Sequence, residues 1–307
     1  MLNLERLRVL HAVSTTGSVV GAAKTLHVTT SAVSQQMARL EREVGQRLVE
    51  RNGRGVRLTE TGRLLAGEAA ELMARVERVE AGLAAHRGAV AGRLDVAAFA
   101  TAARGLFPGV LRELRSRYPE LRVSLTEREP HEAIPALVRS QLDLVVVQDW
   151  VGDALSVPKG LSRVPLLHDR LDVALPAGHP LAGRDTVGLG ELADEEWIAW
   201  SEGEICHDWL VRTLSHAGTR PRFAHTASEH STQLALVEAG LGIAVIPRLG
   251  RESGSGSVRF AAIEPAPVRQ VFALYRDSTA AKPAIAATVD ELVRQAGEGA
   301  SPRRPGG

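Results

Sequence analysis

Short hydrogen-bonding side chains gather near residue 30, where a helix is predicted to begin. The apolar positions of that helix lie four, three and four residues apart, the spacing of a helix with one buried face: Val33, Met37, Leu40 and Val44. The hydrogen-bonding side chains fall on its other faces, close to its N-terminus: Thr30, Ser31, Ser34 and Gln35. Such side chains at the start of an exposed helix can hydrogen-bond to base edges in the major groove of DNA. The alternative is that they are ordinary capping and surface residues.

A basic hairpin is predicted after this helix. Over residues 48–59, two short apolar runs flank an Asn52-Gly53 turn and a second glycine, a pattern typical of a β-hairpin. Its arginines could contact DNA phosphates, and the one at the turn could enter the minor groove: Arg51, Arg54 and Arg57. Two short helices precede residue 30, the first stopped by Gly17 and the second capped by Ser18. Residues 1–59 are therefore predicted to form a winged helix-turn-helix.

Positive charge is concentrated in the same segment. The whole chain of 307 residues has a formal net charge of only +1. Residues 2–63 carry ten Lys or Arg against five Glu, an excess of five positive charges. Each arginine alone, Arg39 included, could belong to a solvated surface. Together with the polar helix they favour a DNA-binding unit.

A long helix is predicted next, over residues 60–86. Its apolar residues form a stripe: Leu64, Leu65, Ala69, Leu72, Val76, Val79 and Leu83. A helix of this length beside a small domain usually packs against a partner helix. We expect a linker and dimerisation helix over residues 60–87 and a hinge over residues 88–93, marked by Gly88 and Gly92.

From residue 94 the pattern changes to alternating strands and helices. Strands are predicted over 94–99, 121–125, 142–147, 172–175, 197–200, 242–246 and 269–275, and helices over 107–118, 132–140, 208–217, 232–239 and 285–294. Apolar strands alternating with helices imply parallel sheets covered on both faces. We expect an α/β domain over residues 94–296 with two lobes, the first over about 94–162 and 267–296 and the second over about 163–266, followed by a flexible tail over 297–307.

The ends of these strands are the expected ligand cleft, because open α/β sheets bind ligands at the carboxyl ends of their strands. After the first strand, hydroxyl and backbone N–H groups meet a helix N-terminus suited to an anion. The candidate residues are Phe99, Ala100, Thr101, Ala102, Thr126, Gln148, Trp200, Ser201, Thr226 and Pro247. Each could equally be a loop or core residue without a ligand. Arg104 and His225 could oppose a carboxylate or be solvated.

Composition and motifs disfavour other classes of protein. The single cysteine, Cys206, cannot form an intramolecular disulfide and is expected to be an ordinary partly buried residue in a reducing compartment. No run of about 18 apolar residues occurs and the N-terminus is charged, so we expect a cytoplasmic protein without a membrane segment. No metal-ligand cluster or P-loop is present, and Ser201 lacks the glycines of a nucleophile elbow. We therefore expect neither catalysis, nor a metal, nor a cofactor.

A set of residues along the N-terminal segment resembles the signature of LysR-type transcriptional regulators. The set is Gly17-Ser18, Ala22-Ala23, Leu26, Ser31-Ala32-Val33-Ser34, Leu40-Glu41, Gly45, Leu48, Arg51 and Leu58-Thr59-Glu60-Thr61-Gly62. The similarity continues more weakly through Tyr118-Pro119, Leu142-Asp143-Leu144 and residues 238–247. Val49 stands where the family usually has an aromatic residue, which is expected to change only the packing of the wing.

The resemblance implies how such a protein works. A winged helix-turn-helix binds an interrupted palindrome near a promoter, linker helices pair in a dimer, and dimers associate into tetramers. A cleft like that of periplasmic binding proteins takes a small-molecule co-inducer, and RNA polymerase is a possible partner. By position, Thr30, Ser31, Ala32, Ser34 and Gln35 would face the bases, and Arg51 and Arg54 the DNA backbone.

Three other functions remain open from the residues alone. A two-lobed α/β domain could hold an enzyme active site, although no catalytic constellation was found. The C-terminal two thirds could resemble a periplasmic solute-binding protein, against which the basic N-terminal unit counts. An architectural DNA-binding protein without a ligand is the third. A ratio of specific to non-specific DNA affinity separates that third alternative from a regulator.

Overall fold

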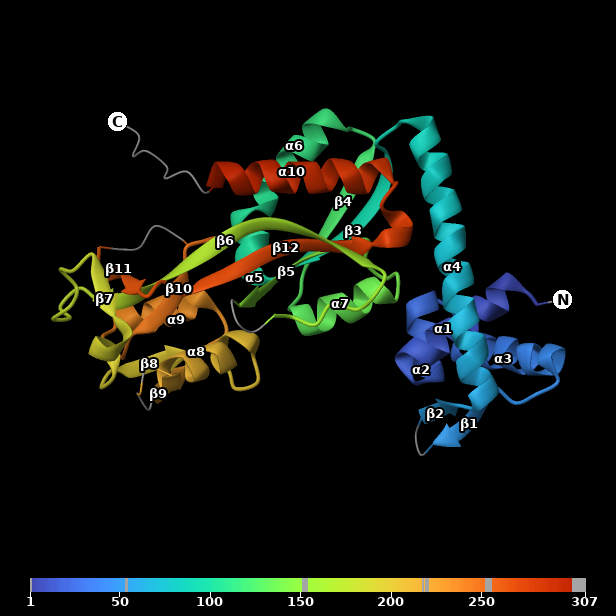
Figure 1. The fold of residues 1–307 in the computed structure, drawn as a ribbon, viewed down its shortest axis with the longest axis horizontal. Helices are drawn as coiled ribbons and strands as arrows, with labels where there is room; N and C mark the ends of the chain where they lie inside the picture. Colours follow the sequence, from blue (N-terminus) through green and yellow to red (C-terminus); the bar gives the residue numbers. More distant parts are fainter. Residues whose placement is uncertain are drawn as a thin grey trace.

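Three helices and a hairpin form the N-terminal unit, at the lower right of Figure 1. The computed structural model describes residues 2–52, 55–150, 154–216, 218, 221–251 and 256–299. The unit comprises α1 (Leu4–Thr16), α2 (Val19–Leu26), α3 (Thr30–Val44), β1 (Val49–Asn52) and β2 (Gly55–Leu58). Each helix follows a residue whose side chain accepts a hydrogen bond from the first turn: Asn3, Ser18 and Thr29. Leu10, Val33, Leu40 and Leu48 are fully buried in its core.

The long helix α4 (Glu60–Arg87) rises from this unit to the C-terminal domain (Figure 1). It begins beside the hairpin, where a Cβ on Gly62 would lie 2.0 Å from the carbonyl oxygen of Leu48, so only glycine fits. At 28 residues it is about 42 Å long. Large apolar side chains along it are exposed: Leu64 by 70%, Leu72 by 45%, Val79 by 59% and Leu83 by 58%.

The first lobe contains a twisted sheet with helices on both faces. Strands β3 (Gly92–Ala98), β4 (Leu121–Glu127) and β5 (Leu144–Trp150) are parallel, and β12 (Val268–Arg276) pairs antiparallel with β5. Helices α6 (Phe107–Arg117) and α10 (Pro283–Gly299) cover one face, and α7 (Pro130–Val138) covers the other (Figure 1). The short helix α5 (Ala100–Gly105) follows β3 directly.

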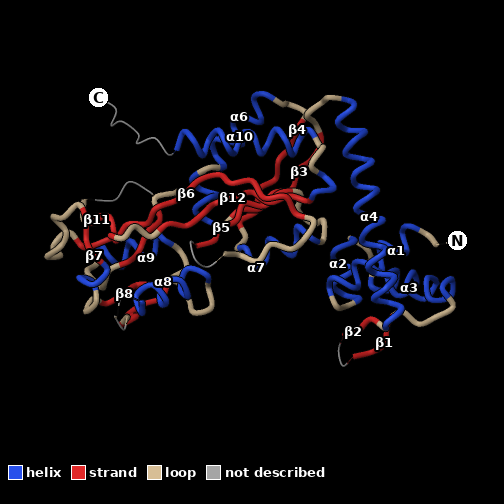
Figure 2. The backbone as a smooth tube through the Cα atoms, in the orientation of Figure 1, coloured by secondary structure: helices blue, strands red, loops and turns tan. Residues whose placement is uncertain are grey.

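The second lobe is built on the far half of one long strand. Strand β6 (Leu161–Pro176) pairs with β12 along its first ten residues, then with β10 (Ala244–Pro247) and β11 (Val258–Glu264), all antiparallel. Strand β7 (Thr186–Gly188) and the turn η1 (Leu189–Leu192) complete that edge, and β8 (Glu196–Ala199) pairs with β9 (Arg222–Thr226). Helices α8 (Ile205–His216) and α9 (His230–Glu238) pack over these strands. The strands shared between the lobes run along the length of the domain in Figure 2.

Buried aromatic residues hold the second lobe to the end of the first. Trp150, at the end of β5, stacks on Trp209 of α8 with ring centroids 3.9 Å apart. Trp150 and Trp197 are essentially fully buried. The lobes therefore meet through apolar contact as well as through the shared strands β6 and β12.

The predicted fold class is confirmed, with corrections to individual elements. Among the described strands, β3 pairs in parallel with β4 and β5, β7 with β11, and β8 with β9, whereas β10, β11 and β12 pair antiparallel with β6. The prediction of parallel sheets was therefore wrong for the shared strands, because apolar runs mark burial and not direction. The prediction also missed α5, β7, β9, β11 and the full length of β6. Strand β3 begins at Gly92, inside the expected hinge, and α10 continues to Gly299, into the expected tail.

Two further observations concern the described part of the chain. None of its helices is both long and apolar enough to cross a membrane. Within the same residues, His, Cys, Asp and Glu side chains nowhere gather in a group of three that could hold a metal ion.

Candidate nucleic-acid interface and ligand cleft

The N-terminal half of α3 presents polar side chains to solvent. Thr30, Ser31, Ser34, Gln35 and Arg39 are exposed, and Ala32 is half-buried. Thr29 caps the helix, since its hydroxyl accepts from the backbone N–H of Ala32 at 3.2 Å. The Ser34 hydroxyl donates to the carbonyl of Thr30 at 2.9 Å, within the helix. All the predicted base-facing residues of α3 therefore lie on one accessible helix end.

The hairpin is only partly described. Arg54 lies outside the described residues, and Arg51 is described as backbone of β1 alone. Arg57 of β2 pairs with Glu50 across the hairpin, at 3.0 Å from Nη2 to Oε1. Both side chains are more than half exposed, so this ion pair contributes little to stability. Because Glu50 neutralises Arg57, the hairpin offers DNA less free positive charge than its arginines alone suggest.

A buried arginine organises the cleft between the lobes. Arg269 of β12 is 1% exposed and pairs with Asp169 of β6, at 2.7 Å from Nη2 to Oδ2. Its guanidinium also donates to the hydroxyl of Thr101 at 2.7 Å and to the side-chain oxygen of Gln148. The charge is thus satisfied by three acceptors from three different elements, as a buried ion pair requires.

Arg269 and Asp169 were not among the predicted cleft residues. A signal was present for Arg269, because it is a charged residue in an apolar strand, and such residues are seldom fully buried unless paired. Asp169, which lies between His168 and Arg170, gives no such signal. Their pairing depends on the register of β6 against β12, where Asp169 lies opposite Arg269. Strand register of this kind is not visible in the spacing of apolar residues.

The predicted cleft residues fall into a buried set and an exposed set. Ala100 is half-buried, and the buried set is Phe99, Thr101, Ala102, Gln148, Trp200 and Pro247; the exposed set is Thr126, Ser201 and Thr226. Thr101 and Gln148 meet through Arg269, whose guanidinium also lies 5.0 Å from the ring centroid of Phe99. Ser201 contacts Ser228, with the hydroxyls 3.2 Å apart. Thr126 and Thr226 take no part in the described Arg269 network.

A small pocket lies where α5, α9 and the end of β10 meet. Thr101 and Pro247 line it together with Arg104, His230 and Arg251. As it stands, it has room for about one water molecule. His230, which is not among the predicted cleft residues, packs edge-on against Trp200 with ring centroids 5.6 Å apart. Burial, together with the positive charges of Arg269 and Arg104, lowers the pKa of His230 to about 3, so its imidazole is neutral.

Acidic side chains also lie near the buried arginine. Glu129 precedes α7 of the first lobe, and Glu204 precedes α8 of the second. Burial and the nearby charge of Glu204 raise the pKa of Glu129, and the positive charge of Arg269 partly offsets that rise. Glu204 accepts a hydrogen bond from the hydroxyl of Ser228. Glu129 therefore lies close enough to both Glu204 and Arg269 for their charges to act on it.

Cys206 lies on α8, buried behind these carboxylates. Its sulfur accepts a hydrogen bond from the Gln148 side-chain amide at 3.6 Å. Burial, reinforced by the negative charges of Glu129 and Glu204, raises the pKa of the thiol to about 12. A thiol with so high a pKa stays protonated at neutral pH and is a poor nucleophile.

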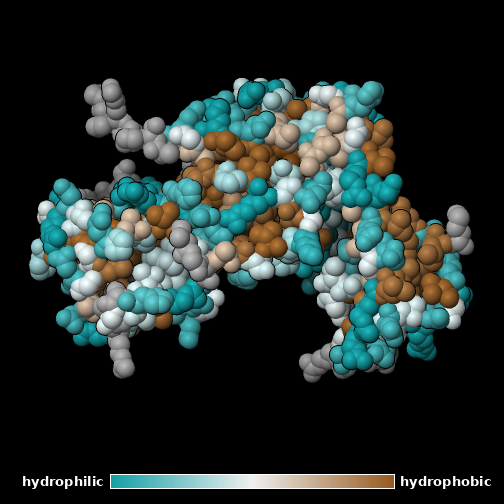
Figure 3. All heavy atoms as spheres, viewed as in Figure 1, coloured by the Kyte–Doolittle hydropathy of each residue, from teal (hydrophilic) through white to brown (hydrophobic). Residues whose placement is uncertain are grey.

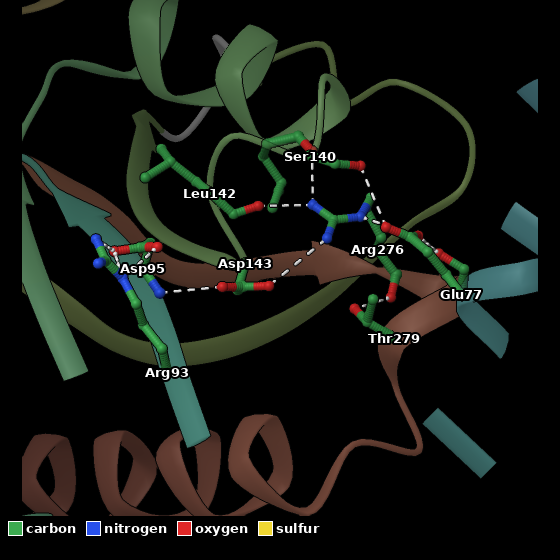
Figure 4. Close-up of polar contacts among 10 residues, drawn as sticks. Glu77, Arg93, Asp95, Ser140, Leu142, Asp143, Arg276 and Thr279 are labelled. Atoms are coloured by element: carbon green, nitrogen blue, oxygen red, sulfur yellow. Dashed lines mark hydrogen bonds and ion pairs between the residues drawn. The ribbon is translucent and has the colours of Figure 1, made fainter. Parts of the chain in front are cut away.

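An ion-pair junction connects α4 to the first lobe (Figure 4). Glu77 of α4 accepts hydrogen bonds from Ser140 at 3.2 Å, from Arg276 Nε at 3.2 Å and from Ser278 at 2.5 Å. Burial alone would raise the pKa of Glu77, but Arg276 and the two hydroxyls lower it overall. Arg276 also donates to the carbonyls of Leu137 and Leu142, at 2.8 and 2.6 Å.

A second contact joins the first lobe to the helix-turn-helix itself. The side-chain amide of Gln141 donates to the hydroxyl of Thr25, on α2, at 2.8 Å. Together with the Glu77 junction, this hydrogen bond holds the N-terminal unit against the end of α7. Neither contact was predicted, because both join segments more than 60 residues apart in sequence.

Comparison with known proteins identifies both parts of the chain. Residues 4–63 match the model of the bacterial regulatory helix-turn-helix protein, lysR family, and residues 87–297 match that of the LysR substrate binding domain. The chain is 30% identical to the HTH-type transcriptional regulator TtuA of Agrobacterium vitis, over 80% of this chain and 81% of that protein. It is 31% identical to a probable hydrogen peroxide-inducible genes activator of Mycobacterium avium, over 89% and 88% of the two chains.

The fold agrees with a solved structure over nearly the whole length. A full-length OxyR variant from Pseudomonas aeruginosa superimposes with a TM-score of 0.75 at 22% identity, covering 99% of both chains. Matches to family models cover the helix-turn-helix and the whole two-lobed domain. This protein therefore belongs to the LysR family of DNA-binding transcriptional regulators, which join a helix-turn-helix to an effector-binding domain.

Proposed function

We propose that this regulator reads promoter DNA through the exposed N-terminal face of α3. Thr30, Ser31, Ala32, Ser34 and Gln35 would contact base edges, with Arg39, Arg51 and Arg54 near the phosphates. The observation that carries this assignment is the accessible polar end of α3, capped by Thr29 and held by a fully buried opposite face. Phosphate contacts position the protein, and the contacts of α3 read the sequence.

A homodimer follows from the exposed stripe on α4. Leu72, Val79 and Leu83 are each about half exposed. Figure 3 shows further apolar surface at the right of the molecule, over the N-terminal unit beside the lower part of α4. A second copy of α4 would cover these side chains, and a two-fold dimer would present two α3 helices to successive turns of one DNA face. Dimers of such dimers would give the tetramer expected from the resemblance.

The cleft between the lobes would hold the small-molecule co-inducer. Among the candidate residues, Thr101 and Gln148 accept hydrogen bonds from Arg269, and Trp200 packs against His230. Pro247 lines the small pocket with His230. The remaining candidates are the buried or half-buried Phe99, Ala100 and Ala102 and the exposed Thr126, Ser201 and Thr226. Ligand binding would change DNA binding only if the ligand distinguishes two arrangements of the lobes. The Glu77 junction would carry such a change from the first lobe into α4.

Thiol oxidation is not the signal we propose for this chain. The related Mycobacterium avium protein is named as a hydrogen peroxide-inducible genes activator. Here the thiol of Cys206 is buried, and two carboxylates keep its pKa high. Peroxide reacts with thiolates, so this sulfur would react slowly. We also propose that the cytoplasmic protein binds its ligand without converting it and needs neither metal nor cofactor.

Genome-wide footprinting with the full-length protein tests the DNA-binding proposal. The strongest site is then compared with a scrambled sequence in a gel shift at fixed salt concentration. We expect tight, sequence-dependent binding at an interrupted palindrome upstream of a few genes. Equal affinity for the native and scrambled sequences would contradict the proposal and support an architectural role.

A further inference from the structure

The pocket between α5 and α9 receives side chains from both lobes. Thr101 and Arg104 belong to α5 of the first lobe, whereas His230 begins α9 and Arg251 follows β10 in the second. Apolar side chains, among them Leu234 and Ile246, form the remaining wall. A group bound here would therefore contact the two lobes at once.

The pocket carries an excess of positive charge. Arg251 and Arg248 both pair with the carboxylate of Asp172, at 2.6 Å and 2.7 Å respectively. These three side chains together therefore carry a net charge of +1. The Arg104 guanidinium donates to the carbonyl of Gly250 at 2.6 Å, and a carbonyl does not neutralise it. Arg269 is balanced by Asp169. An anion would therefore be attracted into this space.

His230 adds an unsatisfied hydrogen-bonding group. Its side chain is 92% buried, at 8% exposed, and among the described residues its Nε2 atom has no hydrogen-bond partner. A buried polar atom without a partner destabilises the folded state, and a ligand atom that pairs with it would recover that free energy. The charged groups that act on the imidazole are Arg269 and Arg104, so its surroundings are positive.

The N-terminus of α9 also favours a bound anion. This nine-residue helix begins at His230, and no side chain caps its first turn. Its free N–H groups and its dipole favour a negative group. Glu229, just before the helix, is exposed and accepts hydrogen bonds from the hydroxyls of Ser231 and Thr232 at 3.2 and 3.5 Å. Ser231 lines the pocket, so the Glu229 carboxylate lies at its edge and offsets one of the two uncompensated positive charges, which leaves one. The Nε2 atom of His230 still has no partner among the described residues.

We propose that this pocket binds the carboxylate of a small organic acid, which is the class of co-inducer this regulator recognises. Arg104 supplies the charge, His230 donates from Nε2, and α9 supplies backbone N–H groups. Because the pocket now has room for about one water molecule, it must widen along its apolar wall to admit the body of the acid. Because Arg104 and His230 belong to different lobes, the bound carboxylate contacts both lobes and favours one arrangement of them. This inference rests on the proposal that the cleft holds the co-inducer.

Formate, the smallest carboxylate, is the probe that tests the pocket directly. The full-length protein is titrated with sodium formate at constant ionic strength, and its melting temperature Tm is followed. We expect a saturable rise in Tm with formate and none with formamide, its uncharged counterpart. Arg104→Gln should raise the formate concentration at half-maximal effect at least about tenfold. Arg112→Gln, which changes an exposed arginine on α6, is the matched control and should behave as the wild type.

Three results would overturn the assignment. Formate and formamide could act alike, or Arg104→Gln could respond as Arg112→Gln does. Inorganic phosphate could instead saturate at a lower concentration than formate, which would assign the pocket to phosphate. A gel shift without any added anion separates this proposal from the one it rests on. Specific DNA binding with no formate effect removes only the carboxylate assignment, whereas loss of specific DNA binding in the wild type removes the proposed function.

Discussion

Gln35 and Arg39 lie one helical turn apart on the exposed side of α3, yet they offer DNA different chemistry. The amide of Gln35 can form two directed hydrogen bonds with an adenine edge, whereas we propose that the exposed guanidinium of Arg39 contacts phosphate. We expect Gln35→Ala to lose about 1–3 kcal/mol at one base pair and to relax preference there. Arg39→Ala should weaken binding to all sequences and reduce the salt slope by about 1.

Competition binding against sites with each base pair substituted measures both effects. The two variants serve as controls for each other, because both remove one exposed polar side chain from the same helix. Equal and sequence-independent losses from the two substitutions would remove the base-reading role from Gln35.

His230 makes stability depend on pH. Its pKa is lowered to about 3 by burial and two arginines, whereas the unfolded chain takes up the proton near the ordinary histidine pKa of 6.5. The unfolded state therefore binds more protons than the folded state between these values, and the free energy of unfolding falls as pH drops below 6.5. Denaturant unfolding at pH 7 and pH 5 should show a smaller difference in His230→Gln than in the wild type. An identical difference in both proteins would refute this contribution.

Cys206 is expected to be inert in the folded protein. With a pKa raised to about 12, its thiolate is a very small fraction of the total at pH 8. Labelling by a maleimide, followed by mass spectrometry, should be slow in the native protein and fast after unfolding in guanidinium chloride. Rapid labelling of the native protein, or its oxidation by stoichiometric peroxide, would show that the thiol is accessible and would reopen a redox role.

The cleft residues show which contacts could be predicted from the sequence and which could not. Thr101 and Gln148 were found because they follow apolar strands, but their shared partner Arg269 was not, since it sits within such a strand. Phe99 and Ala102 were selected by the same logic and are core residues with almost no exposed surface. The end of a strand predicts the neighbourhood of a cleft. Which side chains face it depends on twist and register, which are long-range properties.

At the scale of elements, α4 joins two parts of the molecule through one carboxylate. Glu77 is half-buried against Arg276, Ser278 and Ser140, whereas Glu80 on the same helix is exposed. Glu77→Gln would remove one of the two carboxylates that pair with buried Arg276, leaving Asp143 at 3.7 Å, and we expect the junction to weaken. Hydrogen exchange should then quicken in the middle of α4 and at the end of β12. Glu80→Gln is the matched control, and equal exchange in the two variants would contradict the role of Glu77.

The contrast between Glu77 and the apolar stripe explains which contacts of α4 could be predicted. Leu64, Leu72, Val79 and Leu83 follow a helical spacing, so their common face is visible in the sequence. Glu77 stands among other charged residues of the helix and looks like part of a solvated face. Only the fold brings it to Ser140 and Arg276, some 60 and 200 residues away.

At the scale of the whole molecule, the proposed dimer would fix the distance between two α3 helices. Each helix would then read one half-site, and half-sites separated by whole turns of DNA present the same face. Inserting about five base pairs between the half-sites of the strongest footprint rotates one of them by half a turn, and inserting about ten restores the phase. We expect affinity to fall sharply with the first insertion and to recover in part with the second.

The same DNA series tests whether α4 supplies the rigidity. Leu72→Arg places a charge on the exposed stripe and should shift the protein towards monomers in analytical ultracentrifugation, because two such charges would meet in the paired helices. A monomer reads one half-site at a time, so its weaker binding should be indifferent to either insertion. Leu241→Arg, at a comparably exposed leucine on the second lobe, is the control and should keep the phase dependence. If Leu72→Arg stays dimeric and still responds to phase, another surface must hold the two α3 helices in place.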